Sequence, residues 1–291
     1  MIDFKVDKDI LLEINRIWIP VKQLREGIEH AVKNKIESVF IWNGGEADEQ
    51  TINLDLLVKV PFVKSLEIAI PLSKESNIEG IYSLSQLVSL AYFSYDQFPL
   101  EHSVFKKLRY LYTHYSKNHH TEKSRLSRLT NLEFLKIWHV NTEDCEFLIG
   151  CNKVTNLEIT WGSVNALSGL KDLPALSEVK LYGLNKLSDV EDLLLSNSIK
   201  GVSIEKCKKL TDNLPYGLFG KIQSLFIDKI NSWNGVEKLL EVEHLGFLNT
   251  ADGNLEPLLK LPKVSEISFY PNKKQYSHTK EALNEMLKER K

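Results

Sequence analysis

The sequence lacks the long hydrophobic runs and the cysteine pairs that mark membrane-spanning and disulfide-rich proteins. No segment of its 291 residues approaches the roughly eighteen uninterrupted apolar residues of a transmembrane helix. It has three cysteines, an odd number, and no CxxC pair. We therefore expect no disulfide-stapled secreted module, and we expect Cys151 and Cys207 to be buried structural thiols rather than metal ligands or nucleophiles.

The net charge is small, and the common catalytic motifs are absent. The formal net charge of −2 argues against general nucleic-acid binding, which needs a strongly basic face. No GxSxG, P-loop, GxGxxG or HExxH motif is present. Residues 1–9 alternate charged with apolar residues and lack the hydrophobic region of a secretory signal. We expect a cytoplasmic protein that uses no cofactor and binds no membrane.

A recurring apolar pattern occupies most of the chain. The pattern Leu-x-x-Leu-x-Leu occurs eleven times, and successive copies begin 20 to 27 residues apart. A period of this length is typical of a solenoid, whose units each bury one apolar face against their neighbours. Apolar residues two apart in a strand point to the same side, which predicts one short strand per unit. The units begin at Ile36, Val63, Leu87, Leu108, Leu132, Val154, Leu176, Ile199, Ile222, Val242 and Val264.

The residues before each strand extend the pattern. Apolar residues also lie six and three positions upstream of most units; Leu170 and Leu173, for example, precede Leu176. The segment 170–181 resembles the leucine-rich repeat family, in particular its short, roughly 22-residue, internalin-like type, and the resemblance covers about residues 36 to 270. It implies an α/β solenoid: an arc with about eleven parallel strands on its concave face and short helices or turns on its convex face. It also points to a bacterial source.

The N-terminal residues 1–35 are expected to cap the solenoid, because uncapped repeats would expose their core. Strands are predicted within residues 2–19, where apolar residues alternate with polar ones. Pro20 then opens a helical pattern, since proline is favourable at the start of a helix. The expected buried stripe of this helix is Val21, Leu24, Ile28 and Val32.

The repeats are assigned to residues 36–272, and residues 273–291 to a C-terminal cap. No linker rich in proline, glycine or serine divides the chain, so we expect one continuous domain. A short capping helix is predicted from Thr279 to Arg290. Its expected apolar side is Ala282, Leu283, Met286 and Leu287.

The solvent-facing strand residues are the candidate partner contacts. Residues two, four and six positions after the start of each unit should point out of the concave sheet. Aromatic residues cluster there in adjacent units, and acidic residues follow towards the C-terminus. Clustered exposed aromatics mark interfaces, although cross-strand stacking that only stabilises the sheet is the alternative. The candidate partner-binding residues are Phe93, Tyr110, Tyr112, His114, Phe134, Lys136, Trp138, Glu158, Glu178, Lys180, Tyr182, Glu205, Phe226 and Asp228.

A group of histidines offers a different chemistry. His114 and His139 could approach each other from neighbouring strands, with His119, His120 and Glu122 in the following loop. Their spacing matches no recognised zinc pattern. We therefore predict no metal site and keep a metal-dependent enzyme as the weakest alternative.

These features predict a non-enzymatic protein-binding module that recognises another protein through an aromatic and acidic concave face. A partner with apolar residues ringed by lysine or arginine would suit such a face. One version of this function is a cognate, immunity-type inhibitor of a toxin or enzyme. The alternative is a regulatory or scaffold subunit that positions a partner enzyme without blocking it.

Overall fold

All eleven strands predicted from the repeat pattern are present in the computed structural model, which describes residues 4–45, 49–92, 100–115, 117, 121 and 125–290. Each strand begins two residues after the first apolar residue of its unit. The strands are β3 (Ser38–Trp42), β4 (Ser65–Ala69), β5 (Ser89–Tyr92), β6 (Tyr110–His114), β7 (Phe134–Val140), β8 (Asn156–Gly162), β9 (Glu178–Tyr182), β10 (Gly201–Glu205), β11 (Ser224–Ile230), β12 (His244–Thr250) and β13 (Glu266–Phe269).

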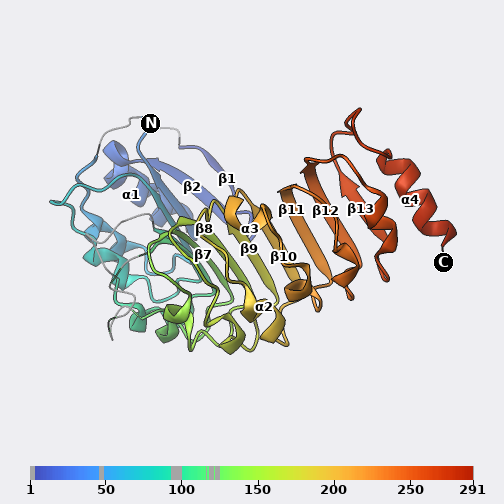
Figure 1. Ribbon diagram of the computed structural model, residues 1–291. Helices are drawn as coiled ribbons and strands as arrows, with labels where there is room; N and C mark the ends of the chain where they lie inside the picture. Colours follow the sequence, from blue (N-terminus) through green and yellow to red (C-terminus); the bar gives the residue numbers. More distant parts are fainter. Residues whose placement is uncertain are drawn as a thin grey trace. The chain divides into compact units, whose positions relative to one another are not determined.

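The chain divides into two compact units, Met1–Ile137 and Trp138–Lys291, and the repeats continue through both. Within each unit the repeat strands pair in parallel and in chain order (Figure 1). Equivalent repeat positions pair with each other, as Leu66 does with Leu90 and Val202 with Leu225. Because the same position lines up from strand to strand, the buried apolar side chains form a continuous ladder on one side of the sheet.

Short helical segments return the chain from each strand to the next. Leu170, the first residue of one such segment, and Leu173, the residue after its end, are both fully buried. Most returns are single 3-10 turns, since about 20 residues leave little room for a longer helix. No helix among the described residues is both long and apolar enough to cross a membrane. The segments are η2 (Leu54–Lys59), η3 (Glu79–Ser83), η4 (His102–Val104), η6 (Leu126–Arg128), η7 (Glu146–Leu148), η8 (Leu170–Asp172), α2 (Glu191–Leu195), α3 (Lys208–Thr211), η9 (Tyr216–Phe219), η10 (Val236–Lys238) and η11 (Glu256–Lys260).

The N-terminal segment adds a further parallel strand to the sheet. β1 (Val6–Lys8) pairs antiparallel with β2 (Asn15–Pro20), and β2 pairs parallel with β3 in the register of a repeat strand. The chain then turns through η1 (Val21–Gln23) into α1 (Leu24–Asn34), close to the predicted helix start.

Two positions in the predicted stripe are not buried: Val21 lies in η1 and is partly exposed, and Val32 of α1 points outward. Val32 is 40% exposed, and the buried residues of α1 are Leu24, Gly27, Ile28 and Ala31. The reason is the close approach of α1 to β2: a Cβ at Gly27 would lie only 2.5 Å from Cγ2 of Ile19. The helix therefore turns its smallest residues towards the strand, and Val32 points away.

The predicted C-terminal helix is present as α4 (Lys280–Glu289), beyond β13 (Figure 1). Thr279 caps it, because its side-chain oxygen accepts a hydrogen bond of 3.2 Å from the N–H of Ala282. Leu283 and Leu287 are buried, whereas Met286 is 40% exposed, so its assignment to the packed side is wrong. Leu283 and Leu287, four residues apart, form a narrow stripe that is sufficient to cover the last repeat.

Candidate protein-binding face

Thirteen of the fourteen candidate partner-binding residues lie where the repeat pattern predicts them. We call the strand side that carries them the open face; it consists of the residues two, four and six positions after the start of each unit. All thirteen lie in strands β6 to β11 and are partly or fully exposed, while most of their neighbours in the strand are buried. Phe93 lies outside the described residues.

In the first unit, aromatic side chains contact each other across strands. The rings of Tyr112 and Phe134 lie 5.2 Å apart between centroids, at an angle of 31°. The guanidinium of Arg109 lies 5.4 Å from the ring centre of Tyr110 and is also paired with Glu133. All three aromatic side chains remain half-buried rather than fully covered. Lateral stacking therefore uses part of their surface and leaves part of it available.

His114 and Lys136 in the first unit, and Trp138 at the start of the second, are also half-buried open-face residues. Among the described residues, no group of three His, Cys, Asp or Glu side chains could hold a metal ion. The candidates His119, His120 and Glu122 lie outside the described part of the chain.

In the second unit, part of the predicted negative charge is neutralised. Nζ of Lys180 lies 3.0 Å from Oε1 of Glu158, and the Glu158 side chain is only 15% exposed. Glu178 and Glu205 keep exposed or half-exposed positions. The open face is thus less acidic than a count of its carboxylates predicts.

Two glycines leave room for neighbouring side chains on this face. A Cβ at Gly246 would come within 2.8 Å of the Phe226 ring, and a Cβ at Gly201 would overlap the carboxylate of Glu178. The paired register places Phe226 beside Gly246 and Glu178 beside Gly201.

At the carboxyl ends of the strands, the structure adds residues that the repeat pattern did not indicate. Trp161 makes an edge-to-face contact with Tyr182 at 5.0 Å, and Nζ of Lys206 lies 4.9 Å from the Tyr182 ring centre. A hydrogen bond to Tyr182 raises the pKa of Lys206. The backbone N–H of Lys206 donates to Asp228 at 2.9 Å. Trp161, near the end of β8, and Lys206, directly after β10, both have positive φ angles, which strand periodicity does not describe.

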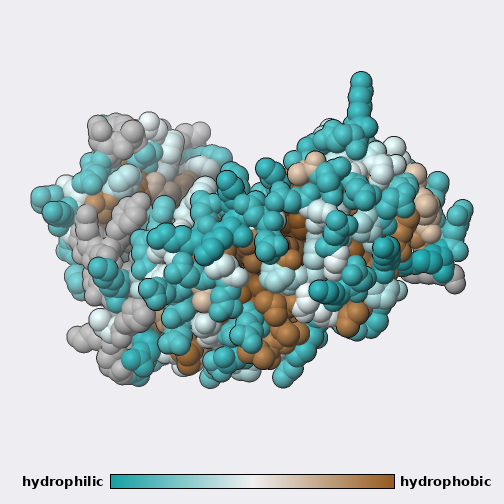
Figure 2. All heavy atoms as spheres, in the orientation of Figure 1, coloured by the Kyte–Doolittle hydropathy of each residue, from teal (hydrophilic) through white to brown (hydrophobic). Residues whose placement is uncertain are grey.

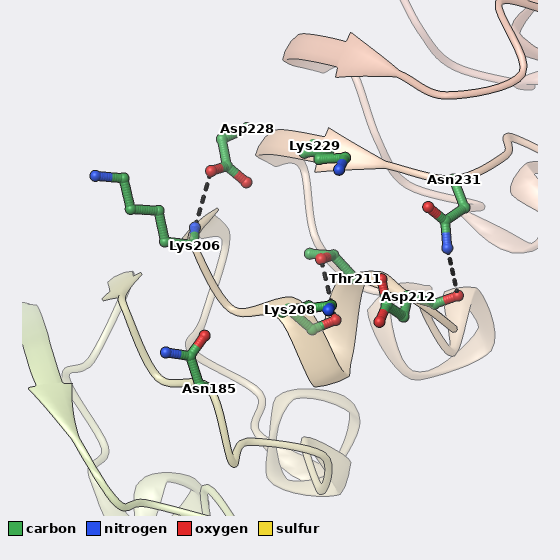
Figure 3. Close-up of a pocket in the computed structure, with 8 residues that line it drawn as sticks. All are labelled: Asn185, Lys206, Lys208, Thr211, Asp212, Asp228, Lys229 and Asn231. Carbon is green, nitrogen blue, oxygen red and sulfur yellow. Dashed lines mark hydrogen bonds between the residues drawn. The ribbon is translucent and has the colours of Figure 1, made fainter.

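A pocket of about 290 Å³ lies next to this group (Figure 3). Its polar lining is partly occupied by internal hydrogen bonds: the side-chain amide of Asn231 donates to the carbonyl of Asp212, and the Thr211 hydroxyl donates to that of Lys208. Lysine and aspartate side chains alternate around it. The residues that line it are Asn185, Lys206, Lys208, Thr211, Asp212, Asp228, Lys229 and Asn231.

A second group that sequence periodicity missed lies at the amino-terminal end of the first unit. Arg16 makes two hydrogen bonds to Asp7, of 3.0 and 3.2 Å, and its guanidinium lies over the rings of Trp18 and Phe40. Hydrogen bonding to Arg16 lowers the pKa of Asp7 despite partial burial. Trp18 and Phe40 meet edge to face at 4.5 Å. The alternation of β2 was visible in the sequence, but its parallel pairing with β3 was not.

Asp9 connects this group to the repeat strands. Its carboxylate is 5% exposed and accepts hydrogen bonds from the N–H groups of Leu11 and Leu12 and from the hydroxyl of Ser38. Burial raises the pKa of Asp9, but hydrogen bonds from Ser65, Ser38 and the two backbone groups outweigh it, so the pKa is lowered. Asp9 is therefore a structural anion that fixes the β1–β2 turn over the sheet.

Figure 2 shows one side of the molecule, on which hydrophobic residues occur in separate areas among hydrophilic ones. Exposed examples include Trp161, Leu248 and Tyr270 at the carboxyl ends of strands in the second unit. Recognition through such a surface would combine ring contacts with polar ones.

No protein-family model matches the sequence. A curated FBD-associated F-box protein of Arabidopsis thaliana is 33% identical over 84 residues, which cover 28% of this chain and 20% of that protein. The chain thus spans about a fifth of the length of that relative.

Solved structures are similar over most of this chain. An internalin of Listeria monocytogenes has a TM-score of 0.52 and 15% identity, covering 85% of this chain and 77% of its own. A chain of the Drosophila Toll–Spätzle complex has a TM-score of 0.55 and 13% identity, covering 85% of this chain and 34% of its own. At such identities these similarities bear on the fold alone. Together with the repeat period and the parallel strands, they show that this protein has the leucine-rich repeat fold.

Proposed function

We propose that the protein is a non-enzymatic protein-binding module that recognises its partner through the open face. The observation that carries this proposal is the group of aromatic rings held on the strands of that face with part of their surface exposed. Tyr112 and Phe134 in the first unit, and Tyr182 and Phe226 in the second, share this property. Exposed aromatic residues on a rigid sheet are the residues that most often dominate binding energy in protein interfaces.

The sheet also fixes these rings before binding. Phe226 lies close to Gly246, and Tyr182 contacts both Trp161 and Lys206. Side chains that are already ordered lose little conformational entropy in a complex. Removing one central ring would then weaken binding by about 2–4 kcal/mol, or about 30- to 1000-fold.

The charges suit an inhibitor of the immunity type, whose target has apolar residues ringed by lysine or arginine. Glu178, Glu205 and Asp228 lie around the rings of the second unit, and charge complementarity would favour a basic target surface. A cytoplasmic location agrees with the three buried, free thiols. A scaffold subunit would use the same face but would leave the partner active.

The test is affinity capture from a lysate of the source cell, followed by binding measurements with the purified partner. Two variants remove rings, Tyr112→Ala/Phe134→Ala in the first unit and Tyr182→Ala/Phe226→Ala in the second. Two controls, Val58→Ala and Leu195→Ala, remove exposed apolar residues from the return segments η2 and α2. Circular dichroism verifies that each variant is folded.

Loss of binding in either ring variant, with binding retained in both controls, would support the open face as the site. Equal loss in the control variants, or full retention in both ring variants, would contradict it. An activity assay on the purified partner then separates the two versions of the function. Inhibition supports the immunity-type version, and unchanged activity with altered location or assembly supports a scaffold.

A further inference from the structure

The first unit contains a hollow of about 290 Å³ on its open face, under the turn that joins β1 to β2. Residues of β4, β5 and β6 form its floor, and Arg16 of β2 and the turn residues 9–11 form its wall. All of these residues belong to the same compact unit. The lining consists of Asp9, Ile10, Leu11, Arg16, Ser65, Leu66, Glu67, Ser89, Ala91 and Tyr112.

The hollow exists because small residues occupy successive strands between larger ones. In one row across the sheet, Phe40 pairs with Glu67, Glu67 with Ala91, and Ala91 with Tyr112. In the row beside it, Ser65 pairs with Ser89. Aromatic rings therefore stand on both sides of a depression whose floor carries one carboxylate.

That carboxylate, on Glu67, has little internal compensation. The atom of Arg16 nearest to it, Nη1, is 3.9 Å from Oε2, whereas Arg16 makes two short hydrogen bonds to Asp7. Among the described residues, no group donates a hydrogen bond to Glu67. Burial raises the pKa of Glu67, the nearby charge of Arg16 lowers it and that of Asp9 raises it. An added cation would relieve this unfavourable environment.

The remaining charges do not remove the imbalance. Lys5 lies 3.8 Å from Asp7 and over the ring of Trp18, so both cations of this region are directed towards Asp7 and the aromatic rings. With Asp9 and Glu67, three carboxylates face two cations, which leaves one negative charge unbalanced. Both oxygens of Asp9 already accept hydrogen bonds, so Glu67 is the carboxylate that is available to a ligand.

The rim of the hollow is apolar and exposed. Ile10 is 86% exposed and Leu11 42% exposed, at the turn that overhangs the floor. Such residues suit the methylene stem of a long side chain, while its charged end reaches the carboxylate below. The neighbouring aromatic rings add a favourable environment for a cation.

We propose that this hollow receives a lysine or arginine side chain of the partner protein, with Glu67 as its counter-ion. The proposal rests on the proposed function, because it names one contact made through the same open face. It assigns the first unit a charged anchor and leaves the rings as the apolar part of the interface.

The hollow can be tested without knowing the partner. The probes are N-acetyl-lysine methylamide and N-acetyl-arginine methylamide, with N-acetyl-norleucine methylamide as an uncharged control. They are titrated at pH 7 and low salt into the ¹⁵N-labelled full chain, and amide shifts of residues 9–12, 65–67 and 89–91 are followed. Millimolar binding of at least one basic probe is expected, weakened at least about tenfold in Glu67→Gln, because a charge-assisted contact is lost.

Two further variants separate the hollow from general charge or folding effects. Ala91→Leu fills the floor without changing charge and should also abolish binding. Glu79→Gln removes an exposed carboxylate on η3, outside the hollow, and should leave binding unchanged. The amide spectrum of each variant shows whether it is folded.

Equal shifts with norleucine, no shifts with either basic probe, or unchanged binding in Glu67→Gln would overturn the proposal. Putrescine serves as a free diamine, and tighter binding of putrescine than of the amino-acid probes would overturn the assignment to a protein side chain. The titration needs no partner, whereas lysate capture with the ring variants does. A negative titration would therefore contradict the cation-binding hollow, whereas a negative result with the ring variants would contradict the proposed function.

Discussion

Asp9→Ala should destabilise the protein by about 3 kcal/mol, although Asp9 lies in a turn near the chain terminus. Turn residues of this kind usually tolerate substitution. Asp9 differs because one carboxylate serves two purposes: it closes its own turn through the N–H groups of Leu11 and Leu12, and it bonds the Ser38 hydroxyl at 2.8 Å. Ser38 is fully buried in β3.

The magnitude follows from what each donor loses. The two backbone N–H groups are comparable to those of a helix N-cap, whose removal costs about 1 kcal/mol, since water can replace the cap in part. The Ser38 hydroxyl has no access to water, and leaving such a buried group without a partner costs about 1–3 kcal/mol. The sum is about 3 kcal/mol.

Urea unfolding followed by far-ultraviolet circular dichroism measures this difference. The matched control is Asp144→Ala, because Asp144 also accepts a bond from the N–H two residues on, at 3.1 Å, but at the surface. It should cost about 1 kcal/mol or less. The double variant Asp9→Ala/Ser38→Ala should be less destabilised than the sum of the single variants, since the Ser38 hydroxyl is then no longer left without its partner. A cost below about 1 kcal/mol for Asp9→Ala, or strict additivity, would refute the reasoning.

The same contacts set the pH dependence of the Asp9 contribution. The pKa of Asp9 is lowered below its ordinary value of 3.8, so ionised Asp9 stabilises the folded protein fully above that value. The contribution is lost as the pH falls through the lowered pKa. The difference between the native protein and Asp9→Ala should therefore be constant from pH 5 to 7 and shrink below about pH 3.8. Glu67 acts in the opposite sense, because its raised pKa makes its ionised form destabilising.

Three further predictions concern packing, thiols and the C-terminal cap. Gly80→Ala should lower the free energy of unfolding in urea by about 2–3 kcal/mol, because its Cβ would overlap the backbone of η2. The control Gly217→Ala, whose Cβ would make only a 3.9 Å contact, should be nearly neutral. Equal effects of the two substitutions would contradict the packing argument. Burial raises the pKa of Cys151 to about 12 and of Cys207 to about 11, so Ellman's reagent at pH 8 should label neither until denaturant is added. Thr279→Ala should weaken amide protection in α4 by about 1 kcal/mol, and unchanged hydrogen exchange would exclude a capping role.

The repeat strands could be predicted from the sequence because their signal is local. Each apolar pair, such as Leu66 and Ile68, lies within one strand, and burial on one side is its only physical requirement. The two terminal helices were predicted at the right places in the chain. Which side of each helix is buried was predicted only in part. Val32 and Met286 extend an apolar stripe that is wider than the contact surface, and only the neighbouring strand decides which part is buried.

The groups around the candidate sites depend on contacts that are distant in sequence. Asp9 meets Ser38 across 29 residues, and Glu67 approaches Arg16 only because β2 joins the sheet in parallel. Trp161, near the end of β8, and Lys206, just after β10, have positive φ angles that break the strand alternation. No periodic pattern encodes these contacts, so sequence reasoning identified the open face but not the residues that shape it.

The choice of residues on the open face is difficult to explain by stability alone. A strand glycine costs roughly 0.5–1 kcal/mol relative to alanine, because it adds backbone freedom and offers no side chain to pack. Gly201 and Gly246 both lie within strands of the second unit, and neither has a positive φ angle that would require glycine. What each permits is the close approach of a neighbouring side chain, that of Glu178 or Phe226. Since side chains held close to the sheet benefit a binding surface more than an isolated sheet, these glycines support the proposed recognition through this face.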